Sequence, residues 1–139
     1  MSNPSPSVNR IFEAVLYARD LEACAEFYSR GFGLKVLSRT ELMLVLGCGD
    51  NHVLIFNPDL SSAKGRMVPS HGCEGEGHIA FTATEEELPA WRERLAEAGI
   101  EIESEVSWEG SRGTSIYTRD PVGNSVELAP PILWDYLRD

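Results

Sequence analysis

The chain has 139 residues and a formal net charge of −10 at pH 7. Its length is that of one ordinary domain. The acidic excess argues against binding to nucleic acid or to anionic membranes, because both carry negative charge. No apolar run approaches the roughly 20 residues that span a bilayer. The three cysteines lack CxxC spacing, which is typical of a reducing compartment, so we expect a cytoplasmic protein.

Residues 1–9 are polar and rich in proline and serine, and we expect a flexible tail there. A strand is predicted over residues 11–18, with Glu13 as a charge among apolar neighbours. Such a carboxylate either reaches water or needs a partner, because burying it unpaired is costly.

A helix follows the first strand, with Asp20 as its cap and Gly31 or Gly33 as its end. Strands are predicted next over residues 34–39, 41–46 and 52–57. The first half is therefore β-α-β-β-β.

The connector between the halves, residues 59–76, mixes glycine, proline, serine and charged residues. A loop of this length in a compact domain is usually functional or mobile. It contains His71, which is either a solvated loop residue or a catalytic group.

The second half repeats the plan. A strand is predicted over residues 78–83, a capping box over Thr84–Glu87 and a helix that ends at Gly99. Strands follow over residues 100–106, 114–119 and 125–129, and a short closing helical turn over residues 132–137. The fold class is therefore α+β.

Asp-Pro-Val-Gly-Asn, residues 120–124, is a strong turn signal before the last strand. In that strand Val126 and Leu128 alternate with Glu127, which must point to the opposite face. Glu127 is either a solvent-facing residue or, held on a rigid strand beside a tight turn, a ligand for a cation.

Aligning the two halves makes four positions equivalent in pairs. Glu13 matches His78 on the opening strands, and Leu54 matches Glu127 on the closing strands. Three of these four residues carry oxygen or nitrogen ligands.

The chain resembles the vicinal oxygen chelate superfamily, which includes glyoxalase I, extradiol dioxygenases, fosfomycin-resistance proteins and bleomycin-binding proteins. The stretches that carry the resemblance are Val-Leu-Tyr-Ala-Arg-Asp-Leu (15–21) with Phe27-Tyr28, Gly-His-Ile-Ala-Phe (77–81) and Arg-Asp-Pro-Val-Gly-Asn-Ser-Val-Glu-Leu (119–128). They cover nearly the whole chain after the tail.

The resemblance implies one domain, residues 10–139, with βαβββ modules at 10–58 and 77–130. The modules would form a cupped, barrel-like mixed sheet with the helices on its outer face. It also implies a divalent metal ion held by Glu13, His78 and Glu127. Many relatives have histidine in place of Glu13, and a fourth ligand where this chain has Leu54. Two carboxylates and one imidazole suit Mn²⁺, Fe²⁺, Zn²⁺, Ni²⁺ or Mg²⁺.

A metal-dependent enzyme acting on a small oxygen-chelating substrate is the first functional hypothesis. A lyase or isomerase is favoured over a dioxygenase, whose pattern prefers two histidines and one carboxylate. Glu127, Tyr117 and His71 are the candidate catalytic groups. Arg112, Arg119, Trp108 and Phe56 are the candidate substrate-binding residues, although arginines are more often surface residues and Tyr117 can simply pack in a wall. A homodimer is expected, because a half-barrel leaves an unprotected edge.

The second hypothesis is a metal-free small-molecule binding protein of the bleomycin-binding type. Glu13 in place of histidine, together with Leu54, is consistent with partial loss of a metal site. Aromatic side chains would then line an apolar pocket. Metal content separates the two hypotheses, since a binding module should purify without metal.

Overall fold

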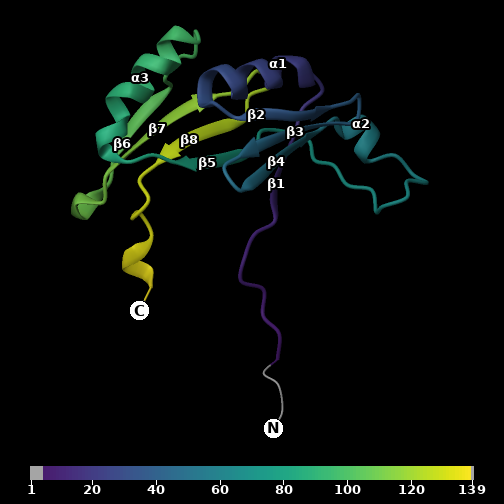
Figure 1. Ribbon diagram of the computed structural model, residues 1–139, viewed down its shortest axis with the longest axis horizontal. Coiled ribbons are helices and arrows are strands. Elements are labelled where there is room, and N and C mark those ends of the chain that lie inside the picture. The colour runs from purple at the N-terminus through teal and green to yellow at the C-terminus, as the bar shows by residue number, and fades with distance from the viewer. Residues whose placement is uncertain (1–4, 139) are drawn as a thin grey trace.

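The structure is a computed structural model in which residues 5–138 are described. The chain forms two four-stranded mixed sheets (Figure 1). The first contains β1 (Glu13–Tyr17), β2 (Lys35–Arg39), β3 (Met43–Cys48) and β4 (Asn51–Phe56), in the order β1-β4-β3-β2. The second contains β5 (His78–Thr82), β6 (Ser104–Ser107), β7 (Thr114–Arg119) and β8 (Ser125–Ala129), in the order β5-β8-β7-β6. The predicted twin β-α-β-β-β plan is confirmed.

Strand register supports the alignment of the two modules. In each sheet the first and last strands are parallel, and Val15 pairs with Leu54 as Ala80 pairs with Glu127. Val15 and Ala80 each lie two residues after Glu13 and His78, the positions matched by sequence. Leu54 therefore occupies in the first module the place that Glu127 occupies in the second.

Local signals explain where the helices begin. Helix α1 (Leu21–Glu26) continues as one π-helical turn (Phe27–Gly31), and the carboxylate of Asp20 accepts a hydrogen bond from the Ala23 amide at 3.0 Å. Helix α3 (Leu88–Glu97) follows a 3₁₀ turn (Glu85–Glu87) that opens with the predicted Thr84–Glu87 capping box. Both caps satisfy amides that a helix start leaves unpaired.

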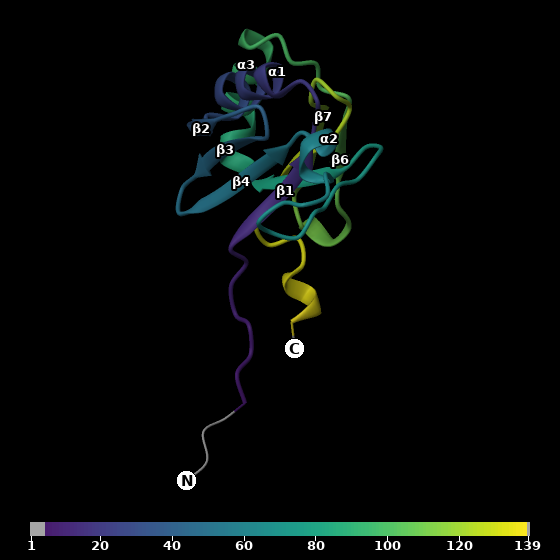
Figure 2. The same cartoon turned by 90° about the vertical axis from the view of Figure 1, so that its right-hand side faces the viewer.

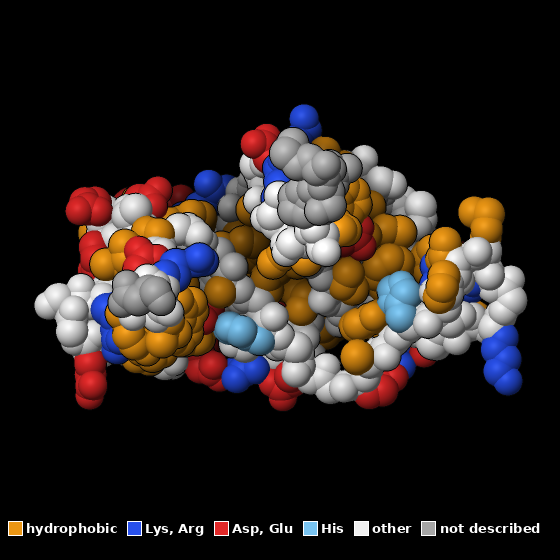
Figure 3. All heavy atoms as spheres, turned by 90° about the horizontal axis from the view of Figure 1, so that it is seen from below, with side chains coloured by type: hydrophobic (Ala, Val, Ile, Leu, Met, Phe, Trp, Pro, Cys, Tyr) orange, Lys and Arg blue, Asp and Glu red, His pale blue; other side chains and the backbone are white. Residues whose placement is uncertain are grey.

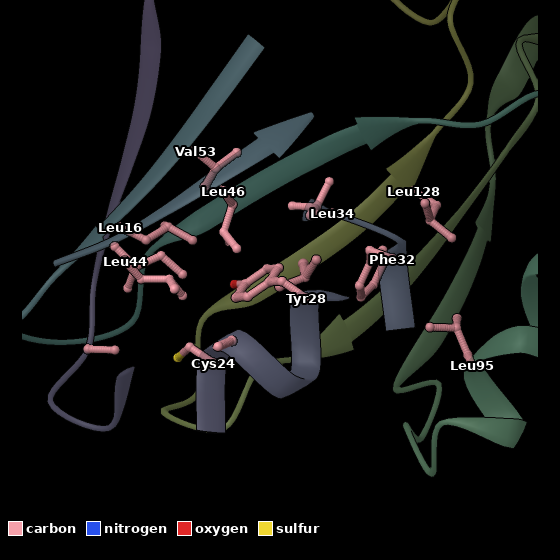
Figure 4. Close-up of a cluster of buried hydrophobic side chains, with 14 of the residues drawn as sticks. Leu16, Cys24, Tyr28, Phe32, Leu34, Leu44, Leu46, Val53, Leu95 and Leu128 are labelled. Atoms are coloured by element: carbon pink, nitrogen blue, oxygen red, sulfur yellow. The ribbon is translucent and has the colours of Figure 1, made fainter. Parts of the chain in front are cut away.

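Helices α1 and α3 lie on the same side of the two sheets (Figure 1). Between them and the strands runs one hydrophobic core shared by both modules (Figure 4). Phe32 follows the π-helical turn. Its ring centroid lies 5.6 Å from that of Phe81 on β5 and 6.0 Å from that of Trp91 on α3. The modules are thus joined by packing as well as by the connector.

The strand predicted over residues 41–46 lies at Met43–Cys48, and those predicted over 34–39 and 52–57 differ by one residue at their ends. There are three larger differences from the sequence expectations. The two sheets do not close into a barrel. The first strand begins at Glu13, and Ile11 and Phe12 before it are exposed. The strand predicted over residues 100–106 is shorter, since β6 covers only Ser104–Ser107. Ile100 and Ile102, inside the predicted strand, instead pack against the core.

The remaining segments are largely irregular. Helix α2 (Pro58–Ser61) begins the connector, and the residues between it and β5 form no further helix or strand. Residues 5–12 are exposed and lie outside the sheets (Figure 2), and the first four residues of the predicted tail lie outside the described residues. The chain ends in a 3₁₀ turn at Asp135–Leu137, inside the predicted closing turn. No helix among residues 5–138 is long and apolar enough to cross a membrane.

Candidate metal centre

His78 and Glu127 lie side by side on neighbouring parallel strands of the second sheet, β5 and β8. The Nε2 atom of His78 is 3.2 Å from Oε1 of Glu127. The imidazole is half exposed, whereas the carboxylate is buried. The pair therefore forms a polar site that a ligand can reach from the histidine side.

The hydrogen bond at Nδ1 of His78 determines whether Nε2 carries a hydrogen or a lone pair. Nδ1 lies 3.2 Å from the backbone carbonyl oxygen of Ser125. A carbonyl can only accept, so Nδ1 carries the hydrogen and a neutral ring presents a lone pair at Nε2. That lone pair faces a carboxylate oxygen, and two acceptors at this distance need a proton or a cation between them.

The spacing of the two atoms fits a divalent cation. Metal–ligand bonds of about 2.1 Å place neighbouring ligand atoms about 3.0 to 3.4 Å apart in octahedral or tetrahedral geometry. The observed 3.2 Å falls in that range. The backbone hydrogen bond at Nδ1 is also the arrangement that orients histidine ligands in metal sites. His78 and Glu127 thus fit two positions of a metal centre.

Two residues of β7, together with Trp108 from the connection before that strand, lie around the carboxylate of Glu127. The hydroxyl of Ser115 donates to Oε2 at 2.6 Å, and the indole N–H of Trp108 donates to that hydroxyl at 2.8 Å. Tyr117 lies directly opposite Glu127 in the β7–β8 register, and its ring stacks on His78. Burial raises the pKa of the Tyr117 phenol, and the negative charge of Glu127 raises it further.

Glu13, the third predicted ligand, is exposed on β1. It lines a cavity of about 280 Å³ where β1 and β5 meet, together with His52 and Ala80. Within residues 5–138, no three side chains of His, Cys, Asp or Glu gather closely enough to hold a metal ion. One chain therefore brings His78 and Glu127 together but does not add Glu13 to them.

His71, in the connector, contacts Tyr17 and Phe56 of the first module and not the His78–Glu127 pair. Its Nδ1 lies 2.6 Å from the hydroxyl oxygen of Tyr17, and its ring meets Phe56 edge-on with centroids 4.6 Å apart. Its amide donates to the carbonyl of Ser61, and its own carbonyl accepts from the Ser61 hydroxyl. His71 is thus anchored on the sheet, which corrects the picture of a solvated loop residue.

The two predicted substrate-binding arginines differ in their surroundings. Arg119 is exposed and forms ion pairs with Glu76 and Glu103. The guanidinium of Arg112 lies over the ring of Tyr136 at 4.2 Å, and its buried Nε has no hydrogen-bond partner among the described residues. Arg112 is therefore the better placed of the two to hold an anionic group.

A family model described as Glyoxalase/Bleomycin resistance protein/Dioxygenase superfamily matches residues 10–128. The chain belongs to this superfamily. The predicted resemblance is confirmed.

Individual relatives carry more specific names. A crystal structure of lactoylglutathione lyase from Agrobacterium tumefaciens is 36% identical with a TM-score of 0.83, covering 94% of this chain and 98% of that one. Glutathione transferase FosA from Serratia marcescens is 30% identical over 122 residues, 88% of this chain and 79% of that protein. Metallothiol transferase FosB from Bacillus licheniformis is 29% identical over 120 residues, 86% and 73% of the two chains. These relatives include both a lyase and two transferases.

Ser115, which donates a hydrogen bond to Glu127, was not predicted from the sequence. Ser115 is two residues before Tyr117 on one strand, so both share the face that Glu127 presents. The alternation of side chains along a strand could have identified Ser115, because it lies on the same face as Tyr117. It was missed because a serine in a strand carries no signal of its own.

Proposed function

We propose that this chain is a glyoxalase-type, divalent-metal-dependent lyase or isomerase that acts on a small substrate with neighbouring oxygen atoms. The observation that carries the proposal is the 3.2 Å approach of His78 Nε2 to the buried carboxylate of Glu127. The 36% identity to a structure named lactoylglutathione lyase supports the lyase reading.

Glu13 is the proposed third ligand, supplied by a second copy of the chain. It matches His78 in the alignment of the modules, yet it is exposed and apart from the pair in one chain. The face opposite α1 and α3 also exposes hydrophobic and histidine side chains (Figure 3). A homodimer that covers this face would bring Glu13 of one protomer to His78 and Glu127 of its partner.

When bound, a divalent ion supplies Lewis acidity that polarises the substrate oxygens, and three protein ligands leave positions open for them. Mn²⁺, Fe²⁺, Zn²⁺, Ni²⁺ and Mg²⁺ all remain candidates for this position. The chain's own residues supply the proton transfers. Glu127 accepts a substrate proton at Oε1, the carboxylate oxygen that Ser115 does not engage.

Tyr117 is the proposed proton donor. Burial and the charge of Glu127 raise the pKa of its phenol, so it stays protonated at neutral pH. It can then donate to an oxygen that becomes negative during the reaction. His71, hydrogen-bonded to Tyr17, is the proposed proton-transfer group of the first module.

The wall of the first module suits an apolar part of the substrate. Leu54 and Phe56 stand there on β4 and are buried. Arg112 on the second module is the proposed contact for a polar or anionic part, and Trp108, whose single N–H is donated to Ser115, is proposed to contact the substrate through its ring. Arg119 is proposed only as a rim contact, because Glu76 and Glu103 already neutralise it.

Thiol transfer is the second candidate function. Two relatives at 29–30% identity are named as a metallothiol transferase and a glutathione transferase, and both match more than four fifths of this chain. The same ligands would serve such a reaction, because it also needs a polarised substrate oxygen. Metal-free small-molecule binding and extradiol-type dioxygenation remain as outcomes of the test.

The test combines metal analysis of the purified protein with a substrate screen. Thiol adducts of α-ketoaldehydes, α-hydroxyketones and diols are assayed with each metal, and epoxides with a thiol. Conversion of a thiol adduct that stops on chelation and in His78→Gln supports the lyase. Epoxide opening supports the transferase, and ring cleavage of a diol with O₂ supports the dioxygenase. A protein that purifies without metal and shows no metal-linked stabilisation contradicts the enzyme proposal.

A further inference from the structure

Two consecutive hydrogen bonds lead from the β6–β7 connection to Glu127. Trp108 Nε1 donates to Ser115 Oγ at 2.8 Å, and Ser115 Oγ donates to Glu127 Oε2 at 2.6 Å. Ser115 is completely buried, and Glu127 is 6% exposed. Water therefore cannot readily replace either bond.

The direction of both bonds follows from the chemistry of the donors. An indole N–H can only donate, so the Ser115 oxygen must accept from Trp108. The hydroxyl has a single hydrogen, and this hydrogen goes to Glu127, which as a carboxylate can only accept. Oε2 is thereby engaged, and Oε1 is the oxygen that faces His78.

The first module provides an internal comparison. Leu44 pairs with Ile55 as Ile116 pairs with Leu128, so Met43 occupies the place of Ser115. Leu54 occupies the place of Glu127 in the same module. The hydroxyl is thus present in the module that has the carboxylate and absent from the module that lacks it.

We propose that Ser115, oriented by Trp108, is a positioning residue that makes Glu127 a one-oxygen metal ligand. The inference rests on the proposed function, since it takes Glu127 to be a ligand. With Oε2 bound to Ser115, the carboxylate neither rotates nor offers both oxygens to the cation. Trp134, whose ring centroid is 6.4 Å from that of Trp108, packs against the indole from the C-terminal segment.

The test compares three variants, each of which removes one hydrogen-bond donor. Ser115→Ala removes the hydroxyl, and Trp108→Phe leaves the hydroxyl but removes the group that orients it. Thr118→Val is the control, because Thr118 is equally buried on the same strand and its hydroxyl bonds the Val126 carbonyl. Mn²⁺ affinity by calorimetry, the visible spectrum of bound Co²⁺ and the melting temperature are measured for each.

Ser115→Ala is expected to weaken Mn²⁺ binding by about tenfold or more and to change the Co²⁺ spectrum. Trp108→Phe should act in the same direction with a smaller effect. Thr118→Val should lower the melting temperature and leave both metal readouts at the wild-type values. If Ser115→Ala does not fold, Trp108→Phe carries the test.

Two other outcomes overturn the inference in distinguishable ways. Wild-type Mn²⁺ affinity and an unchanged Co²⁺ spectrum in Ser115→Ala and Trp108→Phe would make Ser115 a purely structural residue, with the proposed function intact. Failure of the wild-type protein to bind Mn²⁺ or Co²⁺ would instead overturn the proposed metal site itself.

Discussion

The phenol of Tyr28 in the first module donates a 2.7 Å hydrogen bond to the carboxylate of Asp120 in the second, and both residues are buried. Asp120 also accepts from the amides of Val122 and Asn124. The Asp-Pro-Val-Gly-Asn turn, expected only to reverse the chain, is therefore also a joint between the modules.

Removing that phenol should destabilise the protein. Tyr28→Phe keeps the ring but leaves part of a buried carboxylate without a partner, so we expect a loss of about 2 kcal/mol in the free energy of unfolding. Urea unfolding measures it. Tyr136→Phe, at a 55% exposed tyrosine, is the control and should change little. Equal stability of Tyr28→Phe and wild type would show that the joint contributes nothing.

Because the thiol of Cys24 is buried, the free energy of unfolding should fall as the pH rises into the alkaline range. Burial, with a contribution from Asp120 and Asp20, raises the pKa of its thiol to about 12. The unfolded thiol ionises near pH 8.5, so the folded state retains the proton longer. Its contribution is complete below that pH and is lost between about pH 9 and 12, at up to about 1.4 kcal/mol per pH unit.

The measurement is urea unfolding at pH 7 to 10. Cys24→Ala should show a shallower decline between pH 9 and 10 than wild type, whatever its stability at pH 7. Cys73→Ala, at an exposed thiol, should decline as wild type does. Identical slopes for wild type and Cys24→Ala would rule out the assigned cause.

Much of the fold could be predicted because its signals are local. Residues 114–119 and 125–129 form strands with the predicted ends, since turn residues bound an alternating pattern. The caps at Asp20 and Thr84 depend on contacts within three residues. Ile100 and Ile102 misled the prediction because apolar alternation reports burial, and packing against the core buries them without strand pairing.

The candidate site was less accessible from sequence. The alignment of the two modules pointed to His78 and Glu127, because His78 matches Glu13 on the opening strands and Glu127 matches Leu54 on the closing strands. Ser115 was not predicted, and Trp108 was predicted only as a substrate contact, because their hydrogen bonds depend on tertiary partners that no local pattern encodes. The tie of His71 to Tyr17 joins residues 54 apart, and no periodic pattern encodes it.

Leu54 offers a test of the twofold relationship. Leu54→Glu places a carboxylate at the position equivalent to Glu127, so we expect tighter metal binding, by about tenfold, from a fourth ligand. Leu54 is buried, so the metal-free variant should also melt lower. Leu54→Gln is the control, with the same melting penalty and no gain in affinity. Weaker metal binding by Leu54→Glu would contradict the equivalence.

A site shared between two chains predicts complementation. Glu13→Gln and Glu127→Gln are each expected to bind metal poorly. After mixing, unfolding and refolding together, half of the dimers are hybrids, and each hybrid has one intact site. Tight binding should then return at about one site per four chains. No recovery would mean that Glu13 and Glu127 act within one chain or that Glu13 is not a ligand.

The central claim is that one divalent cation is held by Glu13, His78 and Glu127, and Mn²⁺ calorimetry on single variants tests it most directly. Glu13→Gln and His78→Gln should each weaken binding by about tenfold or more while the melting temperature without metal is retained. His52→Gln, at the neighbouring histidine in the β1–β5 cavity, should bind as wild type does. Wild-type affinity in Glu13→Gln or in His78→Gln would contradict the proposed centre.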